Sequence, residues 1–211
     1  MESFRHLVDT PQLLALAAAL GWASGIRLYA AVFLAGLAGF MGWIDLPHGL
    51  RVLQHPGVMA ASGFMCFVEF FADKIPLVDT LWDTVHTVIR IPAGAALAAG
   101  ALGADSQAMG WVAALLGGSL AATSHAAKLT TRAAVNTSPE PFSNIAVSLV
   151  EDGFVVFMLW LSAAHPVIFA IALVLTLVLA VVLMIVLIKF LRAVIARLRE
   201  FFAGQRSPQG S

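Results

Sequence analysis

The chain has 211 residues, of which 60% are hydrophobic and 11% charged, and its twelve acidic side chains balance its twelve basic ones. This composition, with a mean hydropathy of +0.91, indicates an integral membrane protein. A net charge of zero gives no reason to expect a nucleic-acid partner, and a single cysteine excludes an intramolecular disulfide. At this length, residues 1–211 form a single membrane domain, with the lipid bilayer as its partner.

Six apolar segments follow one another along the chain, each long enough to cross a bilayer as a helix. Their boundaries are set by the lengths of the apolar runs and by proline and glycine residues. The predicted helices cover residues 11–41, 56–73, 78–103, 108–135, 142–164 and 166–200. The sequence therefore predicts an all-α, polytopic membrane helix bundle of about six transmembrane helices.

The first segment, residues 11–41, is too long for a simple crossing. It contains Gly21, Ser24 and Gly25 close to the charged Arg27. Such a cluster favours a local break in the helix, and a tilted continuous helix is the alternative. The same small residues permit close helix approach, either within the chain or between subunits of a homo-oligomer.

The last segment sets the expected orientation. It is uncharged from Pro166 up to Lys189 and then carries Arg192, Arg197 and Arg199, a basic end that marks the cytoplasmic side of a membrane. With six crossings, the N-terminus lies on that side too. We therefore expect a multi-pass protein of the inner (cytoplasmic) membrane with both termini in the cytoplasm.

Three helices followed by three helices suggest two related halves, residues 11–103 and 108–200. A serine followed by a basic residue occurs in each half: Ser24 with Arg27, and Ser124 with Lys128. An odd number of helices in each half makes the halves inverted, an arrangement common in transporters. A 3+3 inverted repeat and a bundle without a repeat both remain open.

A ladder of ionisable residues runs along the third segment. Asp79, Asp83, His86 and Arg90 stand at positions i, i+4, i+7 and i+11, so they share one helical face. Ionisable groups at membrane depth are costly and usually line a bundle interior or a water-filled cavity. We expect this face to point away from lipid and take it as the first candidate site. The alternative is a helix lying flat at the membrane interface, anchored by Trp82.

Eleven charged residues lie inside or at the ends of the predicted spans, six acidic and five basic. They are Arg27, Glu69, Asp73, Lys74, Asp79, Asp83, Arg90, Lys128, Arg132, Glu151 and Asp152. Mutual pairing neutralises almost all of them. One hypothesis is an ion-pair network that only fixes helix packing, because buried charges have to pair. The other is a polar cavity whose charges bind a solute or move a proton.

The fourth segment carries a basic, hydroxyl-rich face. Ser124, Lys128 and Arg132 stand at positions i, i+4 and i+8, and this chemistry suits a phosphate or a carboxylate. Together with Arg27 they are the candidate substrate-binding residues. In the resting state we expect the same face to pair with acidic residues of neighbouring helices.

The candidate residues for coupling to protons or cations are acidic groups and two histidines that titrate near neutral pH. They are Glu69, Asp73, Asp79, Asp83, His86, His125 and Glu151. Asp79, Asp83 and His86 also have the ligand types of a divalent-cation site. No other cofactor is indicated, because the chain has no P-loop, Rossmann glycine pattern or nucleophile motif.

Several of these motifs together resemble a known family. They are Ser24-Gly-Ile-Arg27, Asp73-Lys-Ile-Pro76 with Asp79, Trp82-Asp83 with His86, Ser124-His125 through Thr131-Arg132, the segment from Asn136 to Asn144, and Glu151-Asp152. The family is a group of bacterial multi-pass membrane proteins known as the domain-of-unknown-function 4126 family. The resemblance covers nearly the whole chain and implies a bacterial membrane protein, without supplying an activity.

The residues favour a small transporter or channel for an anionic or zwitterionic solute, with proton coupling as one version. A first alternative is a metal-dependent membrane enzyme that uses Asp79, Asp83 and His86 on a lipid phosphate. A second alternative is a structural membrane protein whose buried charges serve assembly.

Overall fold

The computed structural model describes residues 2–103, 106–137 and 141–204, and there every regular element is a helix. In chain order they are α1 (Glu2–Phe40), the 3₁₀ helix η1 (His48–Gln54), α2 (Pro56–Ala72), α3 (Val78–Leu102), α4 (Gln107–Val135), α5 (Pro141–Ala164) and α6 (Pro166–Gly204). Helices α2 to α6 begin at or within one residue of the positions predicted from the sequence. The all-α prediction is confirmed, and η1 is an addition to it.

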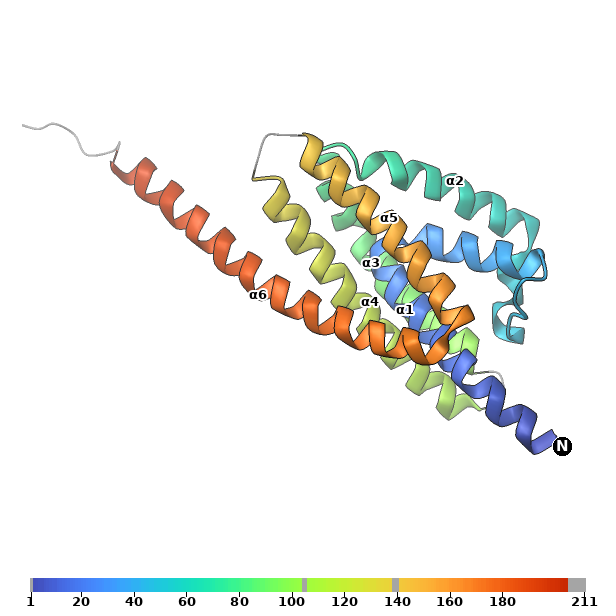
Figure 1. Ribbon diagram of the computed structural model, residues 1–211. Coiled ribbons are helices and arrows are strands. Elements are labelled where there is room, and N and C mark those ends of the chain that lie inside the picture. Colours follow the sequence, from blue (N-terminus) through green and yellow to red (C-terminus); the bar gives the residue numbers. More distant parts are fainter. Residues whose placement is uncertain (1, 104–105, 138–140, 205–211) are drawn as a thin grey trace, which may run out of the picture.

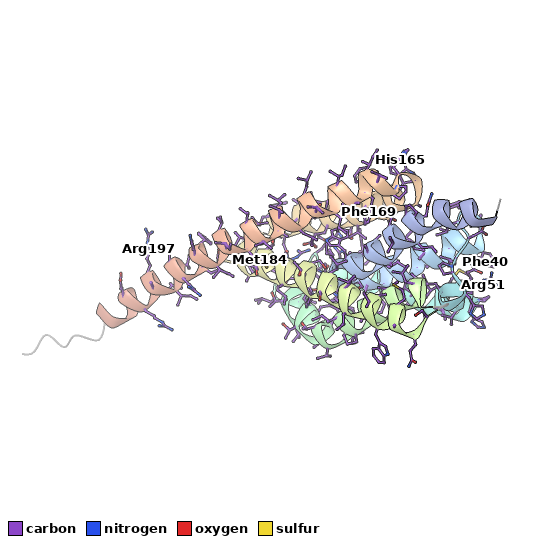
Figure 2. All side chains as sticks on the ribbon, turned by 90° about the horizontal axis from the view of Figure 1, so that it is seen from below. Phe40, Arg51, His165, Phe169, Met184 and Arg197 are labelled. Carbon is purple, nitrogen blue, oxygen red and sulfur yellow. The ribbon has the colours of Figure 1, made fainter. Side chains whose placement is uncertain are left out.

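Helix α1 is broken at Arg27, whose backbone has φ −141° and ψ 71°. The chain doubles back there, so that the two parts of α1, residues 2–26 and 28–40, form a V with Arg27 at its tip (Figure 1). Figure 2 shows Phe40 at the same end of the molecule as His165, with Arg197 far away at the other end. The structure therefore has the local break that the small residues favour, in place of a tilted continuous helix.

Four helices are long and apolar enough to cross a membrane: Pro11–Phe40, Val78–Leu102, Phe142–Ala164 and Pro166–Glu200. Helix α2 is apolar but shorter, and α4 has the length without the hydropathy. The coarse prediction of a membrane helix bundle stands, with four candidate spans by length and composition in the described part of the chain.

The helix directions follow from which residues meet. The first part of α1 runs parallel to α4, because Gly21 lies against Gly117 and the Trp22 carbonyl accepts a hydrogen bond from Ser124. Helix α3 runs antiparallel to both, and it brings Gly94 against the same stretch of α1 and α4. Helix α6 starts beside the beginning of α1 and extends beyond the bundle at the opposite end (Figure 1).

Small residues let α1, α3 and α4 approach closely. A Cβ atom added to Gly21 would lie 2.8 Å from the Cα atom of Gly117, a separation that real Cβ atoms do not show. One added to Gly94 would lie 2.7 Å from the Cβ atom of Ala121. The glycine and alanine positions thus pack helices within the chain, and this close packing brings the polar faces of the three helices together.

The turn between α2 and α3 contains a strained residue. Leu77 has φ +72°, a region that L-amino acids rarely adopt, and its side chain is 75% exposed. Asp73 and Asp79 lie on either side of this turn, and both are fully buried. The tight reversal therefore returns the two carboxylates to the interior of the bundle.

Candidate functional site

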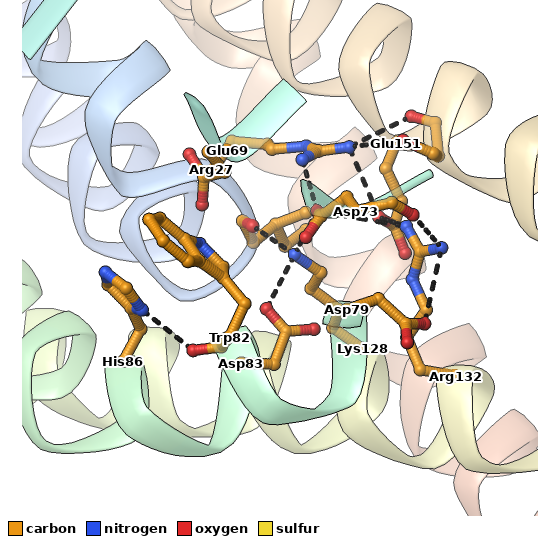
Figure 3. A network of polar contacts seen from close by, with 12 residues as sticks. Arg27, Glu69, Asp73, Asp79, Trp82, Asp83, His86, Lys128, Arg132 and Glu151 are labelled. Carbon is orange, nitrogen blue, oxygen red and sulfur yellow. Dashed lines mark hydrogen bonds and ion pairs between the residues drawn. The ribbon is translucent and has the colours of Figure 1, made fainter. Parts of the chain in front are cut away.

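All eleven charged residues of the predicted spans belong to one network, part of which is drawn in Figure 3. Eight have side chains no more than 2% exposed, and we call them the network core: Arg27, Glu69, Asp73, Asp79, Asp83, Arg90, Lys128 and Arg132. The core contains four cations and four carboxylates. The other three, Lys74, Glu151 and Asp152, are 14–26% exposed and form the network rim, which carries one excess negative charge.

Asp73, at the end of α2, is the centre of the core. Its carboxylate pairs with Arg27 from α1 and lies 2.6 Å from Lys128 Nζ of α4. Arg132 Nη2 is 3.9 Å away, and Arg132 also donates a 2.9 Å hydrogen bond to the Asp73 backbone carbonyl. One carboxylate from α2 therefore ties together the tip of the broken helix and the basic face of α4.

Arg90 on α3 is the centre of a second group of ion pairs in the core, with Glu69 and Asp83. It is the central residue of Val78–Leu102, so it lies near the middle of that candidate span. Its guanidinium binds Glu69 Oε1 at 2.5 Å and Asp83 Oδ1 at 2.7 Å, and Asp83 Oδ1 also lies 2.9 Å from Lys128 Nζ. An arginine at this depth is affordable only with such partners.

The ladder on α3 faces the interior, as its spacing predicts. Asp79, Asp83 and Arg90 are fully buried and His86 is 6% exposed. The acids of this helix therefore do not lie in solvent, as the alternative of an interfacial helix anchored by Trp82 requires. Asp79 accepts hydrogen bonds of 3.1 Å from the Asn136 amide.

The basic residues on α4 form ion pairs with carboxylates of neighbouring helices. Lys128 binds Asp73 and Asp83, and Arg132 binds Glu151 Oε2 at 2.7 Å. Ser124 lies apart from the charges and donates to a backbone carbonyl of α1. The structure therefore brings three of the four candidate substrate-binding residues, Arg27, Lys128 and Arg132, onto shared carboxylates.

The break in α1 is stabilised by side chains of α4. Three carbonyls just before the break contact this helix: Trp22 O with Ser124 Oγ at 2.7 Å, Gly25 O with His125 Nδ1 at 3.1 Å, and Ile26 O with Lys128 Nζ at 3.2 Å. Backbone carbonyls at membrane depth need such partners, because lipid supplies none. The polar face of α4 therefore holds the interrupted helix as well as the carboxylates.

A polar face on α5 completes the site, and the sequence reasoning missed most of it. Asn144 and Ser148 are fully buried and stand at i and i+4, with Glu151 at i+7. Arg132 donates to the Asn144 side chain, and Arg27 Nη2 lies 2.9 Å from Ser148 Oγ. The i, i+4, i+7 spacing in an apolar helix is the same signal that reveals the α3 ladder.

Two buried histidines, His86 and His125, contact hydroxyl groups at the border of the network. His86 Nε2 is 3.1 Å from the Tyr29 hydroxyl, and its ring stacks on Trp82 at 4.1 Å. His125 Nε2 lies 2.8 Å from Thr87 Oγ1, and its Nδ1 lies 3.3 Å from Arg90. Hydroxyls of part-exposed residues thus connect both rings with the edge of the bundle.

Asp79, Asp83 and His86, the candidate metal ligands, have separate partners. Asp79 binds Asn136, Asp83 binds two cations, and His86 contacts Trp82 and Tyr29. Among the described residues, no group of three His, Cys, Asp or Glu side chains is arranged to hold a metal ion. The geometry gives the metal hypothesis, and the lipid-phosphate enzyme that depends on it, no support.

Several buried polar atoms of the network have no hydrogen-bond partner among the described residues. They include the carboxylate oxygens Glu69 Oε2, Asp73 Oδ1 and Asp83 Oδ2 and the donors Trp82 Nε1, Arg90 Nε, Arg132 Nε and Asn144 Nδ2. In native structures such atoms are usually paired, either with protein groups or with ordered water.

Fold and site together define an all-helical protein in the described part of the chain, with apolar helices of membrane-spanning length. The first of them, α1, is broken where it meets a buried network with balanced charges. Residues 14–186 match the family described as Domain of unknown function (DUF4126), and the chain belongs to that family. The resemblance seen in the sequence is thereby confirmed. No significant match is found among curated proteins or among solved structures.

Proposed function

We propose that the protein is a small transporter or channel of the bacterial inner membrane for an anionic or zwitterionic solute. The observation that carries this proposal is the break in α1 at Arg27, in contact with the carboxylate of Asp73. Irregular backbone at membrane depth is tolerated where it is buried in protein or lines a cavity, and transporters use interrupted helices to bind their substrates there. A helix that only anchors a protein has no need of such a break.

In this mechanism the negative group of the solute competes with Asp73 for Arg27 and Lys128. Both cations already share that one carboxylate, so a phosphate or carboxylate can take its place without a new cation being needed. Breaking these contacts frees the tip of α1 from α2 and α4. The network as described is therefore the closed, resting state.

Charge balance gives a reason for proton coupling. The core holds four cations and four carboxylates, so an entering anion leaves it with one uncompensated negative charge at membrane depth. One proton for each negative charge of the solute restores neutrality, whereas a zwitterion needs none. Glu69 is the best placed of the coupling residues, because among the described residues it pairs with a single cation, Arg90. Asp73 and Asp83 each pair with two or more.

We infer an orientation from the basic end of α6, which favours the cytoplasm for the end of the bundle that also holds Lys74 and Arg132. The V of α1 then enters and leaves on the external side. Helices α2 to α6 cross in alternation, so only the N-terminus differs from the sequence prediction and becomes external. The inverted repeat gains no support, because α1 is broken while its counterpart α4 is continuous.

A structural membrane protein is the second candidate, and the exact charge balance of the core favours it. Four cations facing four carboxylates satisfy the requirements of helix assembly without any solute. The two candidates differ in whether the network opens. Purified protein in liposomes, tested with a panel of inorganic and organic anions and zwitterions, should give flux above that of empty vesicles. A complete panel without flux would favour the structural candidate.

A further inference from the structure

Two apolar cavities lie end to end beneath α6. The first, of about 520 Å³, is bounded by α1, α3, α4 and the start of α6 and reaches Leu120 and Val174. The second, of about 410 Å³, lies between α1, α4, α5 and α6 and starts just beyond the first, at Ser124 and Thr176. The two cavities follow one another along the same pair of helices, α4 and α6, and together we call them the α6 groove.

The α6 groove has the dimensions of a site for an alkyl chain. Along α4 it extends from Ala113 to Thr131, about 27 Å at the helical rise of 1.5 Å per residue. Its walls are almost entirely apolar, and each cavity falls in the size range of small-molecule sites. A long hydrocarbon chain fits these walls, whereas a water-soluble solute does not.

One end of the α6 groove is polar. Glu151 and Thr131 line it beside the stem of Lys128. Glu151 Oε2 is held by Arg132 at 2.7 Å and lies 3.8 Å from Arg27 Nη2. Neither the second Glu151 oxygen nor the Thr131 hydroxyl has a hydrogen-bond partner in the described part of the chain. The groove thus ends at one free carboxylate oxygen and one free hydroxyl group.

Charge indicates what occupies this end. The network core is balanced, while the rim of Lys74, Glu151 and Asp152 has one excess negative charge. Glu151 is the rim acid that faces the groove. A cationic amine at Glu151 neutralises the rim, and the Thr131 hydroxyl can donate to a phosphate oxygen beside it. An alkyl chain, an amine and a phosphate together describe an aminophospholipid.

We propose that the α6 groove binds an acyl chain of an aminophospholipid from the surrounding bilayer, with the ammonium group on Glu151. Glu151 pairs with Arg132 at the end of the bundle that we assign to the cytoplasm, so an ammonium group on Glu151 lies toward the headgroups of that leaflet. The inference rests on the proposed function in one respect, since it names the zwitterionic solute as this lipid. Binding itself does not depend on transport.

The test uses the full chain in nanodiscs containing phosphatidylethanolamine, phosphatidylcholine and phosphatidylglycerol in equal amounts. Native mass spectrometry then counts the lipids retained after release. Phosphatidylethanolamine should be retained roughly tenfold more than phosphatidylglycerol, the ratio expected for one charge-assisted hydrogen bond. Equal retention, or a preference for phosphatidylglycerol, overturns the proposal.

Two variants and a control separate the site of the acyl chain from that of the headgroup. Ala180→Trp fills the groove without removing a charge and should abolish retention, while the control Val178→Trp, on an exposed part of the same helix, should not. Glu151→Gln should retain lipid but lose the headgroup preference. Retention that survives Ala180→Trp overturns the groove as the site.

Movement of lipid between leaflets is measured in the same preparations. Flux of water-soluble zwitterions without lipid retention would keep the proposed function and overturn this inference. Lipid retention without any movement of lipid or solute would keep this inference and overturn the proposed function, because the protein would then have a lipid site and no transport activity.

Discussion

Lys128 Nζ lies 2.6 Å from the Asp73 carboxylate and 3.2 Å from the carbonyl of Ile26, the last residue before the break in α1. One ammonium group therefore joins the end of α2 to the tip of the V. A third partner, Asp83 at 2.9 Å, connects the same group to α3. Any movement that frees the tip of α1 has to change the contacts of Lys128.

Removing the central carboxylate should destabilise the protein strongly. Asp73→Asn leaves Arg27 and Lys128 without their shared partner, and an uncompensated buried charge costs about 3–5 kcal/mol. The exposed Asp45→Asn is the matched control and should change stability by less than about 0.5 kcal/mol. Denaturant unfolding in mixed micelles measures both. Equal effects of the two variants would contradict the network as described.

Removing one cation and one carboxylate together should restore most of the loss. Lys128→Met leaves one excess negative charge in the core, Asp83→Asn leaves one excess positive charge, and the double variant is neutral. The free energy of unfolding lost in the double variant should therefore be smaller, by at least about 1 kcal/mol, than the sum of the losses in the two single variants. Simple additivity in this double-mutant cycle would show that the two groups do not interact.

Close helix packing at the break can be tested with glycine substitutions. A Cβ on Gly25 would collide with Ser124 Oγ and the Ala121 carbonyl, so Gly25→Ala should cost about 1–3 kcal/mol. Gly153 on α5 has nothing within 4 Å of an added Cβ, so Gly153→Ala should be neutral or slightly stabilising. If Gly25→Ala unfolds like wild type, α1 and α4 do not meet as described.

Much of this architecture follows from the sequence, because periodicity identifies the buried face of each helix. Asp79, Asp83, His86 and Arg90 are buried as their spacing requires. Pairing partners are harder to predict, since they depend on helix direction and depth. Lys128, for example, binds Asp73 and Asp83 and leaves Glu151 to Arg132.

The break in α1 illustrates the same limit. Small residues beside Arg27 allow a break and a continuous helix equally well, and the deciding contacts come from Ser124, His125 and Lys128, about a hundred residues away. The burial of Asn144 and Ser148 was predictable from the sequence, because their spacing from Glu151 places all three on one face of α5. A polar face in an apolar helix is informative even when it carries no charge.

Relieving backbone strain should stabilise the turn between α2 and α3. Leu77→Gly removes the cost of a positive φ at an exposed side chain, for a gain of about 1 kcal/mol after the added chain entropy of glycine. Ile75→Gly, in the same turn but without a positive φ, should be destabilising. A loss of stability in Leu77→Gly would show that Leu77 is not strained.

Topology provides a test of the V in α1. A reporter fused at the N-terminus should be external, on the same side as Asp45, whereas one fused after α6 should be cytoplasmic. If both reporters lay in the cytoplasm, α1 would cross the membrane once, and the proposal that both ends of its V lie on the external side would be wrong.

The most direct test of the transport account compares flux in liposomes containing wild-type protein and the neutral Lys128→Met/Asp83→Asn variant. Both proteins should fold, because both cores are balanced. Wild type should carry anions or zwitterions, with anion uptake accelerated by a proton gradient, and the double variant should carry almost none. Equal flux through the two proteins, or wild-type flux no higher than that of empty vesicles, would contradict the central claim that this network is a transport site.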